Sequence, residues 1–403
     1  MSLVNLISPD FNGSNPNFQI SFVAGWSCMA RQARPGRAIV RVGLDISQAV
    51  KKKVRGIARY IREILPLLLA QGQTGAIDPV LYARGDRILR RAPLSSMRNG
   101  TPIRWMPFRL YLLGSGLDLF HSFGNYLPVH SRVPLTFTAH DFRVLDVNSD
   151  KSSARLRENV KRSSGIVCLT KHGRSRLLHH FHDYNPERIA VIPHGVDHET
   201  FKPVEKSVAR LTAQKHDLQK PYLIQLGSWF PHKNLETSIE AFAVSQACRE
   251  GFVLAFVGGG ANSDHRENLD TLAKLKGVQD QIKWVEDVPA ADIPAVLAAS
   301  DCLLQPSRYE GFALPLLEAM AVGTPGVASD STCLPEVTGG AWPIFEQDQF
   351  EQFARHIDSM VFDSQKRDAA IEAGQKRAAI FTWEDSAIQT INFFEKIVQM
   401  ESD

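Results

Sequence analysis

The sequence has few cysteines and no paired arrangement of them. Its 403 residues include five, at positions 28, 168, 248, 302 and 333, and no two form a Cys-x-x-Cys pair. This spacing argues against a disulfide-rich secreted scaffold and against the common zinc-finger patterns. Several of these residues stand in apolar runs, where an unpaired cysteine behaves as a small hydrophobic side chain. We therefore expect free thiols and a reducing, cytoplasmic compartment.

Long apolar runs are absent as well. No stretch reaches the roughly 18 consecutive apolar residues that a membrane-spanning helix requires. Residues 19–30 are mildly apolar, but they have neither a basic segment before them nor an Ala-x-Ala pattern, which argues against a signal peptide. We interpret residues 1–37, which contain Asn, Ser, Gly and Pro without periodicity, as a poorly ordered N-terminal extension.

The usual metal-ligating patterns are also missing. The sequence contains no Asp-x-Asp pair and no His/Cys cluster with metal-ligand spacing. We therefore expect chemistry without a metal ion or other cofactor. No recognised nucleic-acid-binding module is present, which argues against nucleic acid as a partner.

Charge is unevenly distributed along the chain. Residues 1–203 hold 29 Lys and Arg against 14 Asp and Glu, a net charge of +15, whereas residues 204–403 hold 17 against 29, a net charge of −12. The basic excess comes from residues 51–55, 84–91, 98–109 and 151–176. Aromatic and apolar residues are interleaved at 105–112, and such a mixture favours peripheral docking on an anionic membrane over a merely solvated surface. This predicts a location at the cytoplasmic face of a membrane.

After residue 38, strand patterns alternate with helix patterns. Apolar runs typical of buried strands lie at 39–46, 79–83, 117–121, 135–139, 165–170 and 189–192, and a second series lies at 222–226, 253–257, 282–285, 302–304 and 326–328. The alternation predicts an α/β protein with two Rossmann-like, doubly wound parallel sheets. A length of 403 residues also favours two domains over one. We place the first over residues 38–203 and the second over residues 204–382.

The most informative stretch is residues 306–335, PSRYEGFALPLLEAMAVGTPGVASDSTCLP. We expect a turn through Glu310 and Gly311 after a strand, then a helix beginning at Pro315, since proline suits the first helical position. Free amides at such a helix N-terminus would bind an anion such as phosphate. We place Glu318 in the first turn. Alone, each Glu is more simply explained as a surface charge, but together at the carboxyl end of a strand they indicate a ligand site.

Glu310 and Glu318, with GFALPLL between them, resemble the E-x7-E motif of retaining GT-B glycosyltransferases of family 4. This group is related to glycogen synthase and to bacterial mannosyl- and glucosyltransferases, and the similarity extends over residues 38–395. It implies a nucleotide-diphosphate sugar donor on the second domain and a glycan or lipid-linked acceptor on the basic first domain, with a cleft between them. It also implies that a last helix, residues 383–403, crosses back to the first domain.

The resemblance assigns roles around the motif. Glu310 would contact the donor sugar, and Glu318 would bind the donor ribose. The amides expected to hold the sugar and phosphate belong to Gly311, Phe312, Ala313 and Leu314.

The segment 227–234 follows a predicted strand and opens a helix, which is the layout of a phosphate site. Lys233 would stabilise the leaving diphosphate, although a solvated lysine at a helix start would look the same. Relatives carry a basic residue before this lysine, and His232 stands there instead, giving weaker charge compensation than an arginine. Gly227 and Val285, each at the end of a predicted strand, are expected near the nucleotide.

A glycine run at 258–260 suggests a dinucleotide fingerprint but does not match it. Ser263 stands where the last glycine of G-x-G-x-x-G is required. We predict a tight turn that lets the nucleotide approach the backbone.

Two segments of the first half also match the family. Gly56 and Arg59 resemble its G-I-G-R-Y segment and are assigned to the acceptor side. His140 stands in Thr-Ala-His-Asp, which resembles a T-x-H-D segment, and is expected to contact the transferred sugar. A lone histidine is more often structural, and His194 and Gly195 are expected to mark the hinge side of the cleft.

The sequence thus predicts a retaining, metal-independent hexosyltransferase of mannose or glucose type, acting in cell-surface polysaccharide synthesis. A nucleotide-sugar epimerase or a phosphorylase of the same fold is an alternative, as is a catalytically inactive sugar- or lipid-binding scaffold. The E-x7-E context argues against the epimerase, and the lack of a pyridoxal phosphate lysine site against the phosphorylase. Intact Glu310, Glu318 and Lys233 argue against the scaffold. The nucleotide base, guanine or uracil, stays open.

Overall fold

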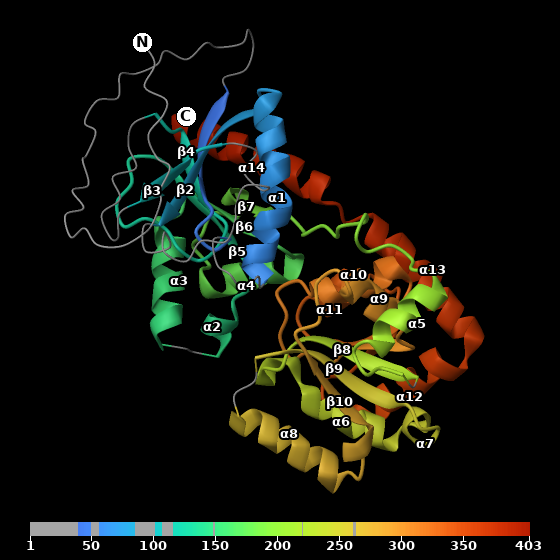
Figure 1. Ribbon diagram of the computed structural model, residues 1–403. Coiled ribbons are helices and arrows are strands. Elements are labelled where there is room, and N and C mark those ends of the chain that lie inside the picture. The colour runs from blue at the N-terminus through green and yellow to red at the C-terminus, as the bar shows by residue number, and fades with distance from the viewer. Residues whose placement is uncertain are drawn as a thin grey trace, which may run out of the picture. The chain divides into compact units, whose positions relative to one another are not determined.

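Two parallel sheets organise the chain (Figure 1). The computed structural model describes residues 39–49, 56–84, 101–106, 116–147, 150–219, 221–260 and 263–403. The first sheet has the order β3-β2-β1-β4-β5-β6-β7, and the second has the order β10-β9-β8-β11-β12-β13. The strand order reverses beside β1 in one sheet and beside β8 in the other, and ligands of open α/β sheets bind at such switch points. The predicted α/β fold with two Rossmann-like sheets is confirmed.

The elements lie close to the predicted ranges. The strands of the first sheet are β1 (Val40–Asp45), β2 (Ile77–Arg84), β3 (Ile103–Met106), β4 (Leu119–Ser122), β5 (Leu135–Ala139), β6 (Gly165–Cys168) and β7 (Ile189–Val191). Those of the second are β8 (Tyr222–Ser228), β9 (Val253–Gly259), β10 (Ile282–Glu286), β11 (Cys302–Gln305), β12 (Gly326–Ser329) and β13 (Ile344–Phe345). The helices are α1 (Gly56–Gln73), α2 (Arg143–Asp146), α3 (Asp150–Arg162), α4 (Lys171–His180), α5 (Lys206–Gln214), α6 (Leu235–Val244), α7 (Gln246–Arg249), α8 (Ser263–Leu275), α9 (Ile293–Ala298), α10 (Leu314–Val322), α11 (Leu334–Thr338), α12 (Phe350–Phe362), α13 (Ser364–Ala379) and α14 (Trp383–Ser402).

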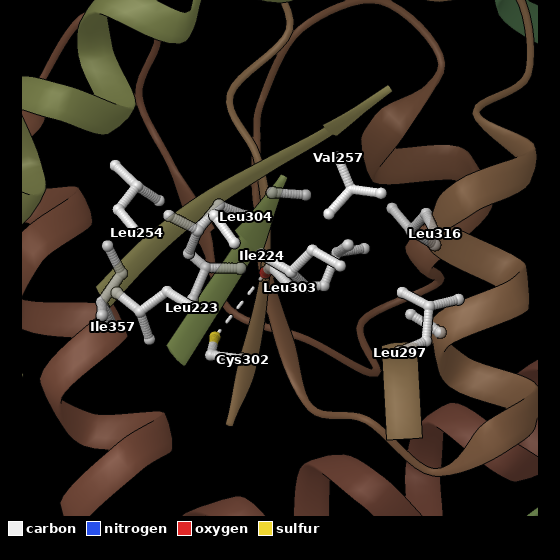
Figure 2. Packing of buried hydrophobic residues seen from close by; sticks show 14 of the residues in the cluster. Leu223, Ile224, Leu254, Val257, Leu297, Cys302, Leu303, Leu304, Leu316 and Ile357 are labelled. Atoms are coloured by element: carbon white, nitrogen blue, oxygen red, sulfur yellow. Dashed lines mark hydrogen bonds between the residues drawn. The ribbon is translucent and has the colours of Figure 1, made fainter. Parts of the chain in front are cut away.

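Helices cover both faces of the second sheet, with α9 and α10 on one side and α6 and α8 on the other (Figure 1). Its central strands are therefore apolar almost throughout, as in other covered parallel sheets. Leu223 of β8 and Leu303 of β11 are fully buried, and Leu316 of α10 and Ile357 of α12 belong to the same core (Figure 2). This rigid core fixes the loops that leave the carboxyl ends of β8 and β11.

The last helix, α14, packs on the first sheet rather than on the second. Trp383 and Phe394 are buried in one cluster with residues of β1 and α1. The chain crosses itself at the start of this helix, where Val196 N donates to Phe381 O at 3.1 Å. A Cβ at Gly195 would lie less than 3.0 Å from the backbone nitrogen of Trp383, so only glycine fits at the crossing.

Several described elements fall outside the predicted ones, among them β3, α3 and α5 and the short elements α2, α11 and β13. β3 lies in a basic segment where no strand was expected, because it is an edge strand paired only with β2. α3 and α5 carry few buried apolar side chains, among them Leu156, Val160 and Ala209. Both helices are mostly polar, so they lack the apolar runs on which the prediction relied.

Several predictions concern residues outside the described ones. The extension at 1–37, the basic segments at 51–55 and 85–100, and residues 107–115 all lie there. The membrane-docking surface and the domain boundary at 203/204 stay predictions. Within the described ranges, no helix has the length and apolar content needed to cross a membrane. Cys168, Cys248, Cys302 and Cys333 are free thiols.

Candidate active site

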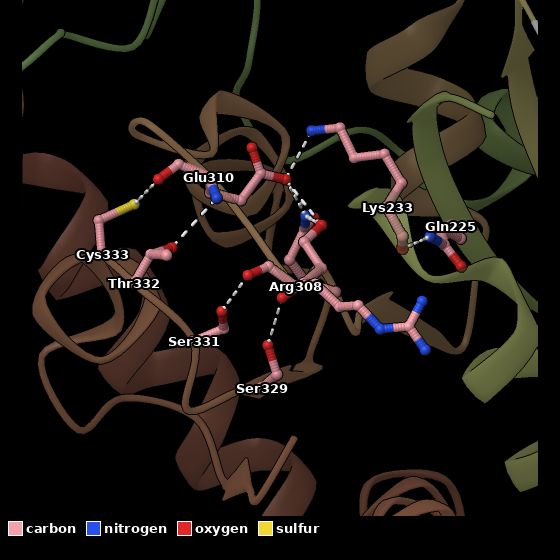
Figure 3. Close-up of polar contacts among 10 residues, drawn as sticks. Gln225, Lys233, Arg308, Glu310, Ser329, Ser331, Thr332 and Cys333 are labelled. Atoms are coloured by element: carbon pink, nitrogen blue, oxygen red, sulfur yellow. Dashed lines mark hydrogen bonds and ion pairs between the residues drawn. The ribbon is translucent and has the colours of Figure 1, made fainter. Parts of the chain in front are cut away.

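The loop after β11 holds a carboxylate that three side chains bind at once (Figure 3). Glu310 Oε1 accepts from Lys233 Nζ at 2.6 Å, from Gln305 Nε2 at 2.7 Å and from Ser307 Oγ at 2.8 Å. Its backbone nitrogen donates to Thr332 Oγ1 at 3.0 Å. Glu310 is 8% exposed, and among the described residues the hydrogen bonds and the ion pair of its carboxylate all involve Oε1 and not Oε2. One carboxylate oxygen is thus fixed, and the other can receive a ligand.

Lys233 reaches this carboxylate from the loop after β8. Residues Pro231–Lys233 form a short 3-10 turn, and Asn234, with φ 55°, begins α6. Gln225 Nε2 donates to Lys233 O at 2.8 Å, and Asn234 Nδ2 donates to Pro306 O at 3.1 Å. The loops that follow β8 and β11 are therefore tied together at the switch point of the sheet. The predicted strand–loop–helix layout around Lys233 is present.

His232, beside Lys233, does not supply a second cation. Burial, together with Lys233 and Arg143 nearby, lowers its pKa to about 4. The ring is therefore neutral near pH 7.

The helix after Glu310 begins one residue before the predicted Pro315. α10 runs over Leu314–Val322, with Ala313 as its N-cap at φ 64°. Glu318 is the fifth residue of this helix, so it lies in the second turn, and the prediction of the first turn was wrong. The reason is the left-handed Ala313, which starts the helix directly after the turn. The amides of Gly311, Phe312, Ala313 and Leu314 precede or begin α10, as expected.

Glu318 and Arg59, assigned from the sequence to opposite substrates, form an ion pair. Glu318 is 2% exposed, and Arg59 reaches it from the first turn of α1. Burial raises the pKa of Glu318, and the Arg59 charge opposes that rise. Gly56, the first residue of α1, has no atom within 4 Å of an added Cβ, so packing does not require glycine there.

His140 lies against the turn that carries Glu310. A Cβ at Gly311 would lie less than 3.0 Å from His140 O, so this glycine permits the close approach of the two segments. His140 Nε2 donates to Phe123 O at 2.8 Å, which leaves Nδ1 as the unprotonated nitrogen. Burial lowers the pKa of His140, so the ring is neutral. A neutral imidazole with Nδ1 unprotonated can accept a hydrogen bond.

A cavity of about 940 Å³ opens beyond the ends of β8, β9 and β10. Gly227, Gly56 and the glycines 258–260 line it, together with Trp229, Arg266 and Glu286. Val285 does not, and its side chain packs against the core of the second sheet. Packing alone requires glycine at position 258, because a Cβ there would overlap the backbone oxygen of Gly227.

The chain is similar to known glycosyltransferases over most of its length. A family model described as Glycosyltransferase Family 4 matches residues 54–200, and one described as Glycosyl transferases group 1 matches residues 210–377. The O-antigen chain mannosyltransferase B of Escherichia coli is 28% identical over 286 residues, covering 69% of this chain and 74% of that protein. The D-inositol 3-phosphate glycosyltransferase of Mycobacterium marinum is 25% identical over 347 residues, covering 78% and 73%.

The chain belongs to the family 4 glycosyltransferases of the GT-B fold.

Solved structures share the fold of this glycosyltransferase. The Anabaena Alr3699/HepE protein in complex with UDP and glucose superposes with a TM-score of 0.69 at 15% identity, covering 90% of this chain and all of that one. WaaG, a glycosyltransferase involved in lipopolysaccharide biosynthesis, superposes with a TM-score of 0.65 at 17% identity, covering 87% and 98%.

Sequence reasoning missed several residues of the glycosyltransferase site. Gln305 and Ser307 hold Glu310, and their nearness in sequence was an available signal. Tyr309 Oη donates to Asp146 Oδ2 at 2.6 Å, linking the Glu310 loop to α2. Glu336 accepts from the backbone nitrogens of Lys171 and His172 at the start of α4, at 2.8 and 3.0 Å. No local sequence pattern predicts the Tyr309–Asp146 and Glu336–α4 contacts, because the residues in each contact lie more than 160 positions apart in the chain.

His194 is buried more deeply than its predicted place at the hinge implied. It is 5% exposed and stacks on Tyr60 with ring centroids 4.6 Å apart, and neither ring nitrogen has a partner among the described residues. Burial holds its pKa well below the ordinary value. Among the described side chains, no group of three His, Cys, Asp or Glu residues is arranged to hold a metal ion.

Proposed function

We propose that the enzyme transfers a hexose, of mannose or glucose type, from a nucleotide-diphosphate sugar to a glycan or lipid-linked saccharide with retention at the anomeric carbon. The observation that carries this proposal is the Lys233–Glu310 pair, 2.6 Å apart, beside the N-terminus of α10. The Lys233 cation suits one phosphate oxygen, and the backbone amides at the helix N-terminus suit a second. The free oxygen of the Glu310 carboxylate suits a sugar hydroxyl.

The main electrostatic task is the charge that develops on the leaving diphosphate. In the proposed reaction the bond between the anomeric carbon and the diphosphate oxygen breaks, and a bond to the acceptor hydroxyl forms on the same face. The acceptor proton passes to the leaving phosphate oxygen. Lys233 and the amides of residues 311–314 stabilise that phosphate, and Glu310 Oε2 orients the sugar. His140 accepts a hydrogen bond from the sugar, and Glu318 binds the ribose hydroxyls.

We further propose that no metal ion takes part and that the acceptor binds on the basic first half of the chain, at the cytoplasmic face of a membrane. The net charge of +15 on residues 1–203 supports attraction to anionic lipid. Similarity to an O-antigen chain mannosyltransferase supports a role in cell-surface polysaccharide synthesis.

A donor panel tests the activity. Purified enzyme is mixed with GDP- and UDP-hexoses, first in thermal-shift experiments, because a ligand that binds the folded state raises apparent stability. NMR of the product then reports the anomeric configuration, and turnover with and without EDTA tests metal independence. Binding without transfer to any acceptor would favour the inactive scaffold, and an inverted product would contradict retention.

Two substitutions test the assigned roles. Lys233→Ala should lower kcat by roughly 100-fold or more, because a transition-state charge loses its partner. Glu318→Ala should weaken nucleotide binding, measured by calorimetry. Lys274→Ala, at an exposed position of α8, is the matched control and should behave as wild type. Wild-type kinetics and binding in both site variants would overturn the assignment.

A further inference from the structure

The cavity beyond β8, β9 and β10 is lined by aromatic side chains and has a polar rim. Trp229 and Phe230 belong to its lining. Trp229 meets Trp284 of β10 edge-on with ring centroids 4.9 Å apart, and Trp284 in turn stacks on the buried Phe256 at 4.6 Å. Val288 and Ile293 add apolar surface to the lining. Apolar walls with a few polar groups suit a planar heterocycle such as a nucleotide base.

Glu286 stands on the rim of this cavity with its carboxylate uncommitted. It is the last residue of β10, it is exposed, and it forms no ion pair or hydrogen bond with the described residues. Gly259 faces it across the end of β9, where an added Cβ would lie 3.6 Å from Glu286 Oε2. The missing side chain at residue 259 leaves the approach to this carboxylate open.

Two side chains with hydrogen-bond donor groups, Arg266 and Trp229, line the same cavity as Glu286. The guanidinium of Arg266 lies 3.8 Å from the centre of the Trp284 ring and pairs with Asp270 at 3.1 Å, so it does not neutralise Glu286. Trp229 is 3% exposed, and its indole Nε1–H has no acceptor among the described residues. An unpaired buried donor lining a cavity is satisfied when a ligand supplies the acceptor.

Guanine and uracil present different edges to such a rim. Guanine has two adjacent donors, N1–H and the N2 amino group, which both oxygens of one carboxylate can accept, and its O6 and N7 accept from an arginine. Uracil has one donor, N3–H, between two carbonyl oxygens that a carboxylate repels.

We propose that Glu286 selects guanine, so that the donor of this glycosyltransferase is a GDP-sugar. The carboxylate of Glu286 accepts from N1–H and the N2 amino group, and Arg266 lies on the acceptor side of the base. This inference rests on the proposed function, because it names the donor of the same site.

The test compares three nucleotides that differ only in the base. GDP, IDP and UDP are titrated into the full-length protein by calorimetry; IDP keeps N1–H and O6 but lacks the N2 amino group. Wild-type protein should bind GDP several-fold more tightly than IDP and at least tenfold more tightly than UDP, the size expected of a bidentate contact.

Glu286→Gln replaces one accepting oxygen by a donor without changing the size of the side chain. The GDP–IDP difference should disappear in this variant, and GDP should lose about tenfold in affinity while UDP binds at least as well as before. Asp287→Asn removes a neighbouring charge from the same rim and should leave the GDP/UDP ratio unchanged.

Equal binding of GDP and IDP by the wild type, a preference for UDP, or a ratio that changes in Asp287→Asn and not in Glu286→Gln would each overturn the inference. A UDP preference would leave the proposed transferase intact. Failure of all three nucleotides to bind would instead remove the proposed function itself.

Discussion

The carboxylate of Glu318 is 2% exposed, and the cation beside it comes from a residue 259 positions earlier in the chain. A buried carboxylate without a counter-ion takes up a proton more readily, because burial disfavours its charged form. The Arg59 charge opposes the rise in the pKa of Glu318 that burial causes, and in the proposed site the charged carboxylate accepts from the ribose hydroxyls. Neither residue could be assigned this relationship from its own sequence neighbourhood.

Arg59→Ala should make nucleotide binding dependent on pH in a range where the wild type is insensitive. The pKa of Glu318, already raised by burial, rises further without the arginine, so affinity falls as pH decreases through that higher value. We expect the midpoint of the affinity–pH profile to move up by about one pH unit or more. Calorimetric titrations between pH 5 and 8 measure it.

Arg59→Lys is the control for charge, and it should return the midpoint most of the way toward wild type. Superimposable profiles for Arg59→Ala and the wild type would show that the ion pair does not govern Glu318.

At the scale of elements, β4 and β5 are joined by a buried histidine as well as by their backbones. His121 is fully buried, and its ring nitrogens lie 2.9 Å from Thr136 Oγ1 and 3.1 Å from Thr138 Oγ1. Burial lowers its pKa to about 3. The folded sheet therefore holds this ring neutral.

Acid should weaken the first sheet through His121. Its pKa is depressed in the folded state, so its stabilising contribution is complete above the unfolded value near 6.5 and is lost as pH falls toward 3. The free energy of unfolding should drop by about 1.4 kcal/mol per pH unit in this window from this residue alone. Urea unfolding at pH 7, 6 and 5 gives the slope.

His121→Gln should remove from that slope the contribution of about one proton. Part of the slope should remain, because the pKa values of His140, His194 and His232 are also lowered in the folded protein. An unchanged slope in the variant would mean that His121 is not held neutral.

At the scale of the whole molecule, the two sheets are joined by a crossing of the chain and by long-range polar contacts. Gly195 passes against Trp383 at the start of α14, Tyr309 reaches Asp146, and Glu336 caps α4. These contacts place the Glu310 loop against His140.

Gly195→Ala should destabilise the protein by about 1–3 kcal/mol, because its Cβ would overlap the backbone at residue 383 and α14 would have to shift. The thermal midpoint should fall accordingly. Gly124→Ala is the matched control, since the nearest atom to an added Cβ there is 3.7 Å away. Equal midpoints for the two variants would show that the crossing tolerates a side chain.

The alternating elements and the motif residues can be predicted from the amino-acid sequence. Strands covered on both faces leave continuous apolar runs in the sequence. Glu310, Lys233 and Gly311 lie in short segments whose turn chemistry is local. Sequence reasoning did not place the edge strand β3 or the mostly polar helices α3 and α5, which contain no long apolar run. It also misplaced Glu318 by one helical residue, because the left-handed Ala313, after which the helix begins, has no signature of its own.

The partners of the site residues follow from how the chain folds and not from any local pattern. The Arg59–Glu318 pair, the Tyr309–Asp146 contact and the neutral His232 depend on burial and on distances between segments far apart in sequence. Propensity and periodicity act over a few residues, whereas a pKa or an ion pair is set by whichever group the fold brings within a few ångströms. For this reason the motif residues could be identified from the sequence, whereas their ion pairs and pKa shifts could not.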